Sequence, residues 1–403
     1  MYSTKKYHLL AIINLFIFLT PLISLASADN YWQRPILPQH PEFPLYPENC
    51  GICHKPQFDA WNGSLHSRAM SPGLMGQLNP DHNPEFAASC YFCHAPLTEQ
   101  AEVKIGARGK GQGMNQSGSH QGSSKYIKNP SFDSKLKLSG VSCPVCHLRE
   151  GKVYGPPARQ GQRASSKGQG KTAHAGVIEK DFFEQAEFCA ACHQMDEGYE
   201  LNGKVLTNTY KEWKESEYSK NNITCQKCHM PDRQHLFRGI HDSDMVKRGV
   251  SFEISAKEIR KDSIKVSLII TNSGVGHYFP TYTTPLIIIK GFIIDGKGKI
   301  IKDTIKKSYI GRKVSLDLTK ELFDTRIPPK GVFNFEYKNI LHKDADRFII
   351  EAKVYPDNFY NEFYKASLKE GSVSDNALIK EALRLTEISA YTLYRNEIDL
   401  KKR

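Results

Sequence analysis

The sequence predicts an α+β chain, with short helices and loops first, then a β-rich region and a C-terminal helix. Between residues 50 and 229 the motif Cys-x-x-Cys-His occurs five times and uses all ten cysteines. Beyond Met245 there is no cysteine, and the chain is rich in runs of Ile, Val, Phe and Tyr. The cysteine and histidine motifs of the first region therefore indicate ligand binding, and the apolar runs of the second indicate β-strands.

The five motifs, numbered 1 to 5 in chain order, predict covalent haem. In each copy two thiols can form thioethers to the vinyl groups of one haem, and the adjacent histidine can bind the iron from the proximal side. The thiols are those of Cys50, Cys53, Cys90, Cys93, Cys143, Cys146, Cys189, Cys192, Cys225 and Cys228, and the proximal histidines are His54, His94, His147, His193 and His229. Zinc knuckles, redox dithiols and structural disulfides are the alternatives, but none of them requires a histidine after the second cysteine. We therefore expect five haems c.

Haem should also supply much of the interior of this region. Residues 50–229 offer only about 36 residues for each motif, too few to enclose every haem in a pocket of its own. The haems must then pack against one another, between short helices and loops. Residues 104–125 and 156–171 are rich in Gly, Ser, Gln and basic residues, a composition typical of surface loops.

The sixth ligand of each iron decides its chemistry, because a second histidine makes an electron carrier and an open position can bind a substrate. The predicted distal ligands are His66, His174, His235, His241 and His277, with His40, His82, His120 and His342 as the alternatives. His66 lies on a Trp-x-x-Ser-x-His unit after motif 1. The unit recurs after motif 4 with Tyr218 in place of the histidine, which predicts a duplicated helical unit whose Trp packs on a haem.

The other four distal ligands are predicted from their surroundings. His235 and His241 flank an apolar stretch directly after motif 5, where a short tether favours coordination. His174 and His277 lie beside small residues that let the backbone approach a haem face. Because His277 belongs to the β-rich region, its coordination would fix that region to a haem. A histidine bonded to backbone at a strand end is the alternative there.

The region beyond Met245 predicts an immunoglobulin-like β-sandwich. Strand-like runs occur at residues 251–255, 264–271, 285–294, 299–305, 332–337 and 347–354. Asp295-Gly296 indicates a hairpin, and a helix is expected from Ser374 to about Arg395. The predicted division is residues 1–28 signal peptide, 29–248 pentahaem cytochrome c domain, 249–365 β-sandwich domain and 366–403 C-terminal helix.

The N-terminus and the net charge bear on location. Lys5 and Lys6, an apolar run at 9–25 and the small-x-small pattern of residues 26–28 predict a signal peptide cut before Asp29, with an uncleaved anchor as the alternative. The expected location is the periplasm or the cell surface. The formal charge is +12, but the ten propionates of five haems would largely offset it. The charge therefore gives no reason to predict nucleic-acid binding.

Several further motifs resemble the exported multihaem cytochromes of the cytochrome c-554-like group. They include Cys-His-Ala-Pro-Leu at residues 93–97, Cys-His-Met-Pro-Asp-Arg at 228–233 and Gly-His-Tyr-Phe-Pro-Thr at 276–281. The resemblance implies a bis-histidine electron-transfer protein with a C-terminal β-sandwich. It also implies distal ligands at the five positions named above. The wider superfamily holds hydroxylamine oxidoreductases and multihaem nitrite reductases, but the Cys-x-x-Cys-Lys haem of the latter is absent from this sequence.

We therefore predict an electron carrier with no catalytic residue of its own. Its expected partners are redox proteins, namely a membrane quinol oxidase, other cytochromes or a terminal reductase. The alternative is an oxidoreductase in which one haem lacks a distal histidine and acts on a small nitrogen or sulfur compound. A third interpretation, compatible with the first, is that the β-rich region docks a larger complex or a second copy of the chain.

Overall fold

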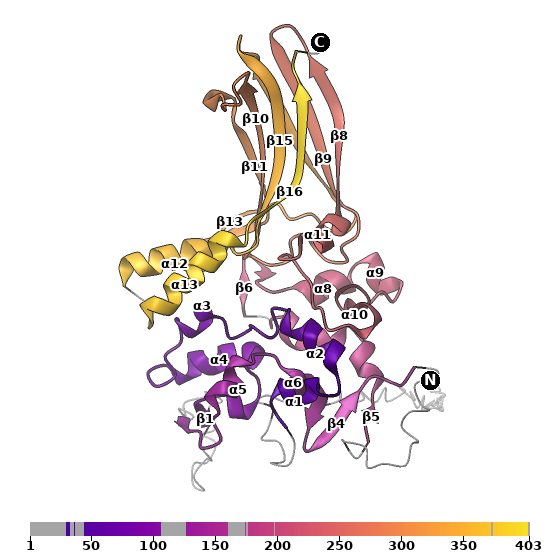
Figure 1. Cartoon of the computed structure of the whole chain (residues 1–403), viewed down its shortest axis with the longest axis vertical. Helices are drawn as coiled ribbons and strands as arrows, with labels where there is room; N and C mark the ends of the chain where they lie inside the picture. The colour runs from indigo at the N-terminus through magenta and orange to yellow at the C-terminus, as the bar shows by residue number, and fades with distance from the viewer. Residues whose placement is uncertain are drawn as a thin grey trace, which may run out of the picture. The chain divides into compact units, whose positions relative to one another are not determined.

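The computed structural model describes residues 30–32, 36, 44–105, 126–159, 174, 176–196, 198–371 and 374–401 (Figure 1). The chain divides into a small unit ending at Gln33 and a large one from Arg34 to Arg403, which holds all five motifs and the β-rich region. The predicted signal peptide and most of the two predicted loops lie outside the described residues. Within the described ranges, no helix is both long and apolar enough to cross a membrane.

Short helices carry the motifs, as predicted. Four of them end at the motif histidine, namely α4 (Pro84–His94), α6 (Cys143–His147), α7 (Glu187–His193) and α10 (Cys225–His229), while motif 1 begins in α1 (Pro47–Gly51). On a helix, residues i, i+3 and i+4 share one face. Both thiols and the histidine of a motif can therefore face the same haem.

The rest of this region, which we call the haem-motif region (residues 44–249), is equally fragmented. Its other helices are α2 (Lys55–Asn62), α3 (Pro72–Met75), α5 (Ser134–Leu138), α8 (Thr209–Lys214), α9 (Glu217–Lys220) and α11 (Ser243–Gly249). Its strands are β1 (Val103–Ile105), β2 (Tyr126–Lys128), β3 (Leu148–Arg149), β4 (Lys152–Gly155), β5 (Ile178–Glu179), β6 (Glu200–Leu201) and β7 (Lys204–Val205). Among these short elements, Met70, Leu78, Ala87, Tyr91 and Ala95 form a small buried cluster.

The β region (residues 250–401) contains two antiparallel sheets that share one hydrophobic core (Figure 1). One sheet has the order β11-β10-β15-β16 and the other β14-β9-β8. The strands are β8 (Val250–Ile259), β9 (Ser263–Asn272), β10 (Leu286–Asp295), β11 (Lys306–Ile310), β14 (Val332–Ile340), β15 (Ala345–Tyr355) and β16 (Tyr391–Asp399). A separate hairpin joins β12 (Arg312–Val314) and β13 (Glu321–Asp324).

The alternation of buried and more exposed residues along the strands explains how the two sheets pack together. In β9 every second residue is buried, with Ile264, Val266, Leu268 and Ile270 facing inward. Ile289 of β10 and Phe348 of β15 come from the other sheet into the same core. Burying one such side chain contributes about 2 kcal/mol, so this core gives the β region a stability that does not depend on haem.

Two predictions about the β region need correction. Residues 299–305 form no strand of a sheet, because the chain makes a 3-10 turn at Lys302–Thr304 and strand β11 begins only at Lys306. The Thr304 hydroxyl accepts from the backbone N–H of Ile293 and donates to the carbonyl of Ile301, which holds this turn against β10. The other five runs are confirmed as strands.

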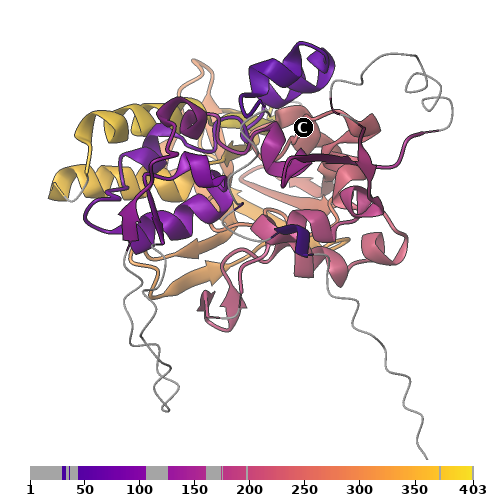
Figure 2. The ribbon, with the colours of Figure 1, turned by 90° about the horizontal axis from the view of Figure 1, so that it is seen from below.

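The predicted C-terminal helix is also wrong in its extent. Helix α13 comprises Asn376–Ile388, and the chain then continues into the edge strand β16 beside β15. A further helix, α12 (Asn358–Glu370), packs against α13. Both contact α3, where a Cβ added to Gly73 would lie 2.6 Å from the Tyr364 ring. Figure 2 shows this helix pair from below, beside the helices of the haem-motif region.

Candidate haem-binding site

The structure places four of the five proximal histidines within 6.3 Å of a predicted distal histidine, measured between ring centroids. Ring centroids lie 6.1 Å apart for His54 and His174, 6.2 Å for His193 and His66, 6.0 Å for His147 and His235, and 6.3 Å for His229 and His277. An imidazole nitrogen bonds a metal at about 2 Å and lies roughly 1 Å from its ring centroid. Two imidazoles on opposite sides of one iron therefore have centroids about 6 Å apart. The donor set thus fits bis-histidine haem iron.

Hydrogen bonds set the tautomer of these rings. The Nδ1 atoms bond to backbone oxygens in five cases, namely His94 to Ala69, His147 to Tyr154, His229 to Arg238, His235 to Arg233 and His277 to Tyr278. In His193 the partner is the hydroxyl of Tyr282. A carbonyl partner requires the proton on Nδ1, which leaves the lone pair of Nε2 for a metal.

Burial also favours the ligating form. It lowers the pKa of these rings, to about 3 for His66 and to about 4 for His147, His193 and His277. Burial lowers the pKa of His94, His229 and His235 as well. Neutral imidazole is the form that binds iron, so these seven rings need not lose a proton near neutral pH.

The motifs themselves lie in contact with one another. The Cys50 thiol of motif 1 lies near enough to Cys143 of motif 3 for each to shift the pKa of the other, and the same holds for Cys189 of motif 4 and Cys225 of motif 5. Thioether formation would remove these thiol protons, but the proximity would remain. Haems held at motifs 1 and 3, and at motifs 4 and 5, would therefore be neighbours.

Motif 4 adjoins three other motifs. Besides Cys225, the neighbouring Cys146 of motif 3 helps to raise the pKa of Cys189. Burial is the main cause of the low pKa of His193, and His229 of motif 5 and His94 of motif 2 lower it further. The arrangement is therefore branched, with motif 4 as the point where motifs 2, 3 and 5 meet.

His241 is the one predicted distal ligand that does not face a motif histidine. Its Nε2 lies 3.0 Å from both carboxylate oxygens of Asp357, which precedes α12. Among the described residues no histidine ring pairs with His94, and Tyr360 of α12 lies near enough to Cys90 of motif 2 to sense its charge. Motif 2 therefore differs from the other four in that, among the described residues, its histidine has no paired ring.

The four alternative histidines fall into two groups. His82 is bonded to Asn79, and His342 lies beside Asp303. His40 and His120 lie outside the described residues.

The duplicated Trp-x-x-Ser-x-(His/Tyr) unit has the same local structure in both copies. The indole N–H donates to a backbone carbonyl at 2.8 Å in each, from Trp61 to Val141 and from Trp213 to Ile223. In each, the serine hydroxyl accepts the N–H of the final residue at 3.2 Å. Tyr218 occupies the place of His66 but packs against Gly276, next to His277. The second copy thus supports the loop that carries a distal histidine.

A loop of the β region reaches two motifs at once. His277 faces His229 of motif 5, and five residues later Tyr282 bonds the Nδ1 atom of His193 in motif 4. Glu212 of α8 holds this loop, because its carboxylate accepts from the N–H of Tyr278 and from the hydroxyl of Thr281. The sequence reasoning missed Tyr282 and Glu212, whose only signal was proximity to His277 and Trp213 along the chain.

Buried ion pairs join the haem-motif region to the β region. Arg326 bonds Glu212 at 2.8 Å and forms two parallel bonds with Asp324 at 2.9 and 3.0 Å. Lys204 also bonds Asp324, at 2.8 Å. The side chains of Arg326 and Glu212 are each 4% exposed, so this network fixes the β-region loop with little screening by water.

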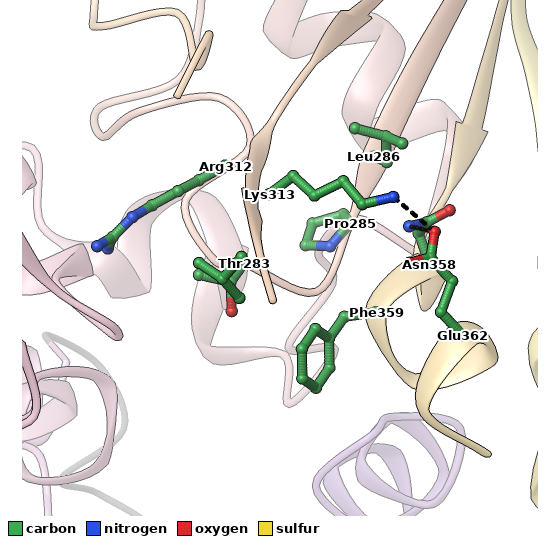
Figure 3. A pocket seen from close by; sticks show the side chains of 9 residues that line it. Thr283, Pro285, Leu286, Arg312, Lys313, Asn358, Phe359 and Glu362 are labelled. Carbon is green, nitrogen blue, oxygen red and sulfur yellow. Dashed lines mark hydrogen bonds and ion pairs between the residues drawn. The ribbon is translucent and has the colours of Figure 1, made fainter. Parts of the chain in front are cut away.

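A small cavity lies where α12 meets the β region, but it contains no motif residue (Figure 3). Its volume is about 10 Å³, and Lys313 and Glu362 form an ion pair of 2.8 Å at its edge. This is room for about one water molecule. The histidine pairs, rather than this cavity, are the candidate site.

Two sequence comparisons and one structural comparison show what this chain is similar to. The sequence family described as cytochrome c554 and c-prime matches residues 49–111, which contain motifs 1 and 2. Cytochrome c-554 of Nitrosomonas europaea is 28% identical over 157 residues, which are 39% of this chain and 60% of that protein. The crystal structure of a penta-heme cytochrome c552 from Thermochromatium tepidum matches with a TM-score of 0.59 and 17% identity, covering 89% of this chain and 100% of that chain. The last likeness concerns the fold.

Proposed function

We propose that the chain holds five haems c and carries electrons through them. The matches to known proteins support a multihaem c-type cytochrome of the c-554 group. The observation that carries this proposal is the spacing of 6.0 to 6.3 Å in four pairs of histidines. Bound haem would supply reversible one-electron chemistry. The ten motif cysteines would attach it, and the paired histidines would hold its iron.

The proposed assignment pairs each motif with a distal histidine. Motif 1 takes His174, motif 3 takes His235, motif 4 takes His66 and motif 5 takes His277. The contacts between motifs support an electron route from motif 1 through motif 3 to motif 4, with branches to motifs 2 and 5.

A count of covalent haem tests the proposal. The pyridine haemochrome of the purified protein should give five haems per chain that acid–organic extraction does not remove. At least four irons should be low-spin in the oxidised protein. A count near zero, with zinc in its place, would refute haem attachment altogether.

The location and the partners follow from the same proposal. We propose export by the signal peptide to the periplasm or cell surface, where redox proteins such as a quinol oxidase, another cytochrome or a terminal reductase exchange electrons with it. We also propose that residues 29–248 are the cytochrome domain and that the immunoglobulin-like sandwich, predicted at 249–365, also includes β16 at Tyr391–Asp399. Its three- and four-stranded sheets around one core support this.

A second function is favoured by motif 2. Among the described residues, no histidine ring pairs with His94. Tyr360 lies near Cys90 of motif 2 and near Asp357, which in turn bonds His241. An open iron there, beside groups that can move protons, is what a reductase or oxidase of a small nitrogen or sulfur compound would need. A high-spin signal of one iron per chain that changes on addition of nitrite or hydroxylamine would support this function. A fully low-spin spectrum would exclude it.

A further inference from the structure

Phe237 lies against the distal histidines of two different motifs. Its ring centroid is 4.2 Å from that of His66, the proposed ligand of motif 4, and 5.8 Å from that of His235, the proposed ligand of motif 3. We propose that Phe237 is a positioning residue that holds both imidazoles turned out of the planes of their proximal partners and thereby sets the reduction potentials of two haems. This inference rests on the proposed haem ligation at motifs 3 and 4.

The angles between the paired rings divide the four pairs into two groups. The ring planes are 47° apart for His66 and the proximal histidine of motif 4, and 33° apart for His235 and the proximal histidine of motif 3. In the pairs at motifs 1 and 5 the angles are only 13° and 15°. The two pairs with the larger angles are those whose distal ring lies against Phe237.

His66 depends on packing for its orientation. Its backbone N–H donates to the hydroxyl of Ser64 and its carbonyl accepts from the N–H of Val141, but within the described ranges no hydrogen bond holds its ring. A ring without such a bond can rotate unless a neighbouring side chain prevents it. Phe237, whose ring is tilted by 55° against that of His66, is such a neighbour.

His235 is held in two ways. Its Nδ1 atom bonds the carbonyl of Arg233 at 3.0 Å, and its ring stands at 89° to the ring of Phe237. This edge-to-face arrangement is one of the two that aromatic pairs prefer. Because the hydrogen bond also orients His235, the effect of Phe237 should be smaller at motif 3 than at motif 4.

The backbone of Phe237 is strained in a way that fits a positioning role. Its φ angle is 45°, in the left-handed region that bulky side chains rarely adopt. Such a conformation persists only where the contacts around it determine it. On one side, the carbonyl of Arg238 bonds Nδ1 of His229 in motif 5, and on the other side Arg233 pairs with Glu184 at 2.6 Å. The chain is therefore anchored on both sides of the strained residue.

The angle between two axial imidazoles affects the stability of oxidised iron. Parallel rings donate electron density to the same iron d orbital and stabilise the electron vacancy of the oxidised state, whereas turned rings divide their donation between two orbitals. Groups around a metal site commonly tune it by orienting its ligands. The haems at motifs 3 and 4 should therefore have higher potentials than parallel rings would give. At motif 4, a higher potential would favour reduction of the haem where the proposed electron route branches.

The test is electron paramagnetic resonance of the intact oxidised holoprotein, because low-spin signals depend on the angle between the axial rings. His66→Ala and His235→Ala assign the signals of motifs 4 and 3, since each should convert one iron to high-spin. Phe237→Leu removes the ring but keeps an apolar side chain, and it should move both signals toward those of motifs 1 and 5. The midpoint potential of motif 4 should fall by up to about a tenfold change in its reduction equilibrium, which is about 59 mV for one electron. That of motif 3 should fall less.

Three further variants separate the ring from other effects. Phe237→Tyr keeps the ring and should keep the parental signals. Phe237→Gly accepts the left-handed backbone without strain but has no ring, so it should behave like Phe237→Leu and replaces that variant if it does not assemble. Phe58→Leu is the matched control, because the half-buried ring of Phe58 contacts Trp61 at 5.8 Å and, in the described part of the chain, no histidine. It should leave every signal unchanged.

Two results would overturn the role of Phe237. One is an unchanged set of signals and potentials in both Phe237→Leu and Phe237→Gly. The other is a parental spectrum in Phe237→Gly alone, which would assign the effect to the backbone rather than to the ring. Failure of the proposed function looks different, since it would show as fewer than five covalent haems in the unmodified protein or as no change of spin state in His66→Ala.

Discussion

At the scale of single residues, one histidine pair would serve both as a metal site and as a connection between regions. His277 lies in the loop between β9 and β10, and its Nδ1 atom bonds the carbonyl of Tyr278 at 2.8 Å. Its ring faces His229 of motif 5. An iron between the two rings would connect the two regions through two metal–nitrogen bonds, in addition to the ion pairs around Arg326.

We expect His277→Ala to keep all covalent haem but to change one iron. The thioethers of motif 5 do not involve His277, whereas loss of a sixth ligand turns a low-spin haem high-spin. Electron paramagnetic resonance should therefore show one additional high-spin iron per chain. His342→Ala, which removes a histidine paired with Asp303 in the β region, should leave the spectrum unchanged. An unaltered low-spin spectrum for His277→Ala would show that another group binds motif 5.

Acid should weaken the ion pairs between the regions. Burial acts to raise the pKa of Asp324, but bonds from Arg326 and Lys204 outweigh it and hold the pKa well below its usual range. A carboxyl group with a lowered pKa in the folded state stabilises that state above the unfolded pKa of about 4, and this stability is lost as the pH falls toward the folded value. The unfolding temperature should therefore decrease once the pH is lower than about 4.

Asp324→Asn gives the matching variant. It should cost about 3 kcal/mol at neutral pH, because Arg326 then lies buried beside only one full carboxylate. The stability of this variant should also change less between neutral and acidic pH than that of the unmodified protein. Asp244→Asn, at an exposed pair with Lys247, should change little. Chemical denaturation at pH 7 and pH 3.5 checks both variants, and parallel pH profiles for Asp324→Asn and the unmodified protein would contradict the assignment.

At the scale of elements, the parts of the fold that the sequence predicted are those with a repeating residue pattern. The alternation of β9 is visible as every second apolar residue, and the motif helices follow from their five identical patterns. Residues 299–305 have the composition of a strand, but the side chain of Thr304 bonds the backbone and stabilises a turn instead. The end of α13 was not predicted, since Tyr391–Asp399 pairs with residues of β15 that lie 37 to 52 positions earlier in the chain. Long-range pairing of this kind leaves no local signal.

The candidate site divides in the same way. The motif residues and the five predicted distal histidines were chosen from local spacing and neighbours, and the structure places four of those five near a motif histidine. The pairing of particular histidines, and the contact of Tyr282 with His193 across 89 positions, depends on how the β region packs on the haem-motif region. Glu212 looked like one acid among 43 acidic residues, and only its burial distinguishes it.

The contact of α3 with the C-terminal helices can be tested at Gly73. A Cβ there would lie 2.6 Å from Cζ of Tyr364 and 3.2 Å from the side chain of Ala382, so the helices must separate to admit it. We expect Gly73→Ala to cost about 1 to 3 kcal/mol. Gly63→Ala is the control, because its nearest neighbour would be a carbonyl at 3.6 Å. Equal unfolding temperatures for the two variants would show that this contact adapts freely.

At the scale of the whole molecule, the haem at motif 2 decides between a pure conductor and an enzyme. Four of the five proximal histidines have a ring at the distance of a second axial ligand, and among the described residues His94 has none. His241, the predicted fifth ligand, has its Nε2 directed at Asp357 instead. In a branched arrangement, motif 2 would be the end of a branch from motif 4. An end position is where a substrate could take electrons without interrupting the route between the other haems.

Carbon monoxide can count open irons across the molecule, because it binds reduced haem only where a position is free or weakly held. We expect one carbon monoxide per five haems in the unmodified protein and two in His277→Ala, since loss of His277 opens motif 5 independently of motif 2. His82→Ala, at an exposed histidine bonded to Asn79, should bind one. If the unmodified protein binds none, motif 2 has a sixth ligand, and His241→Ala, His40→Ala and His120→Ala would then identify it by which of them restores binding. That result would remove the enzyme function and leave the electron carrier.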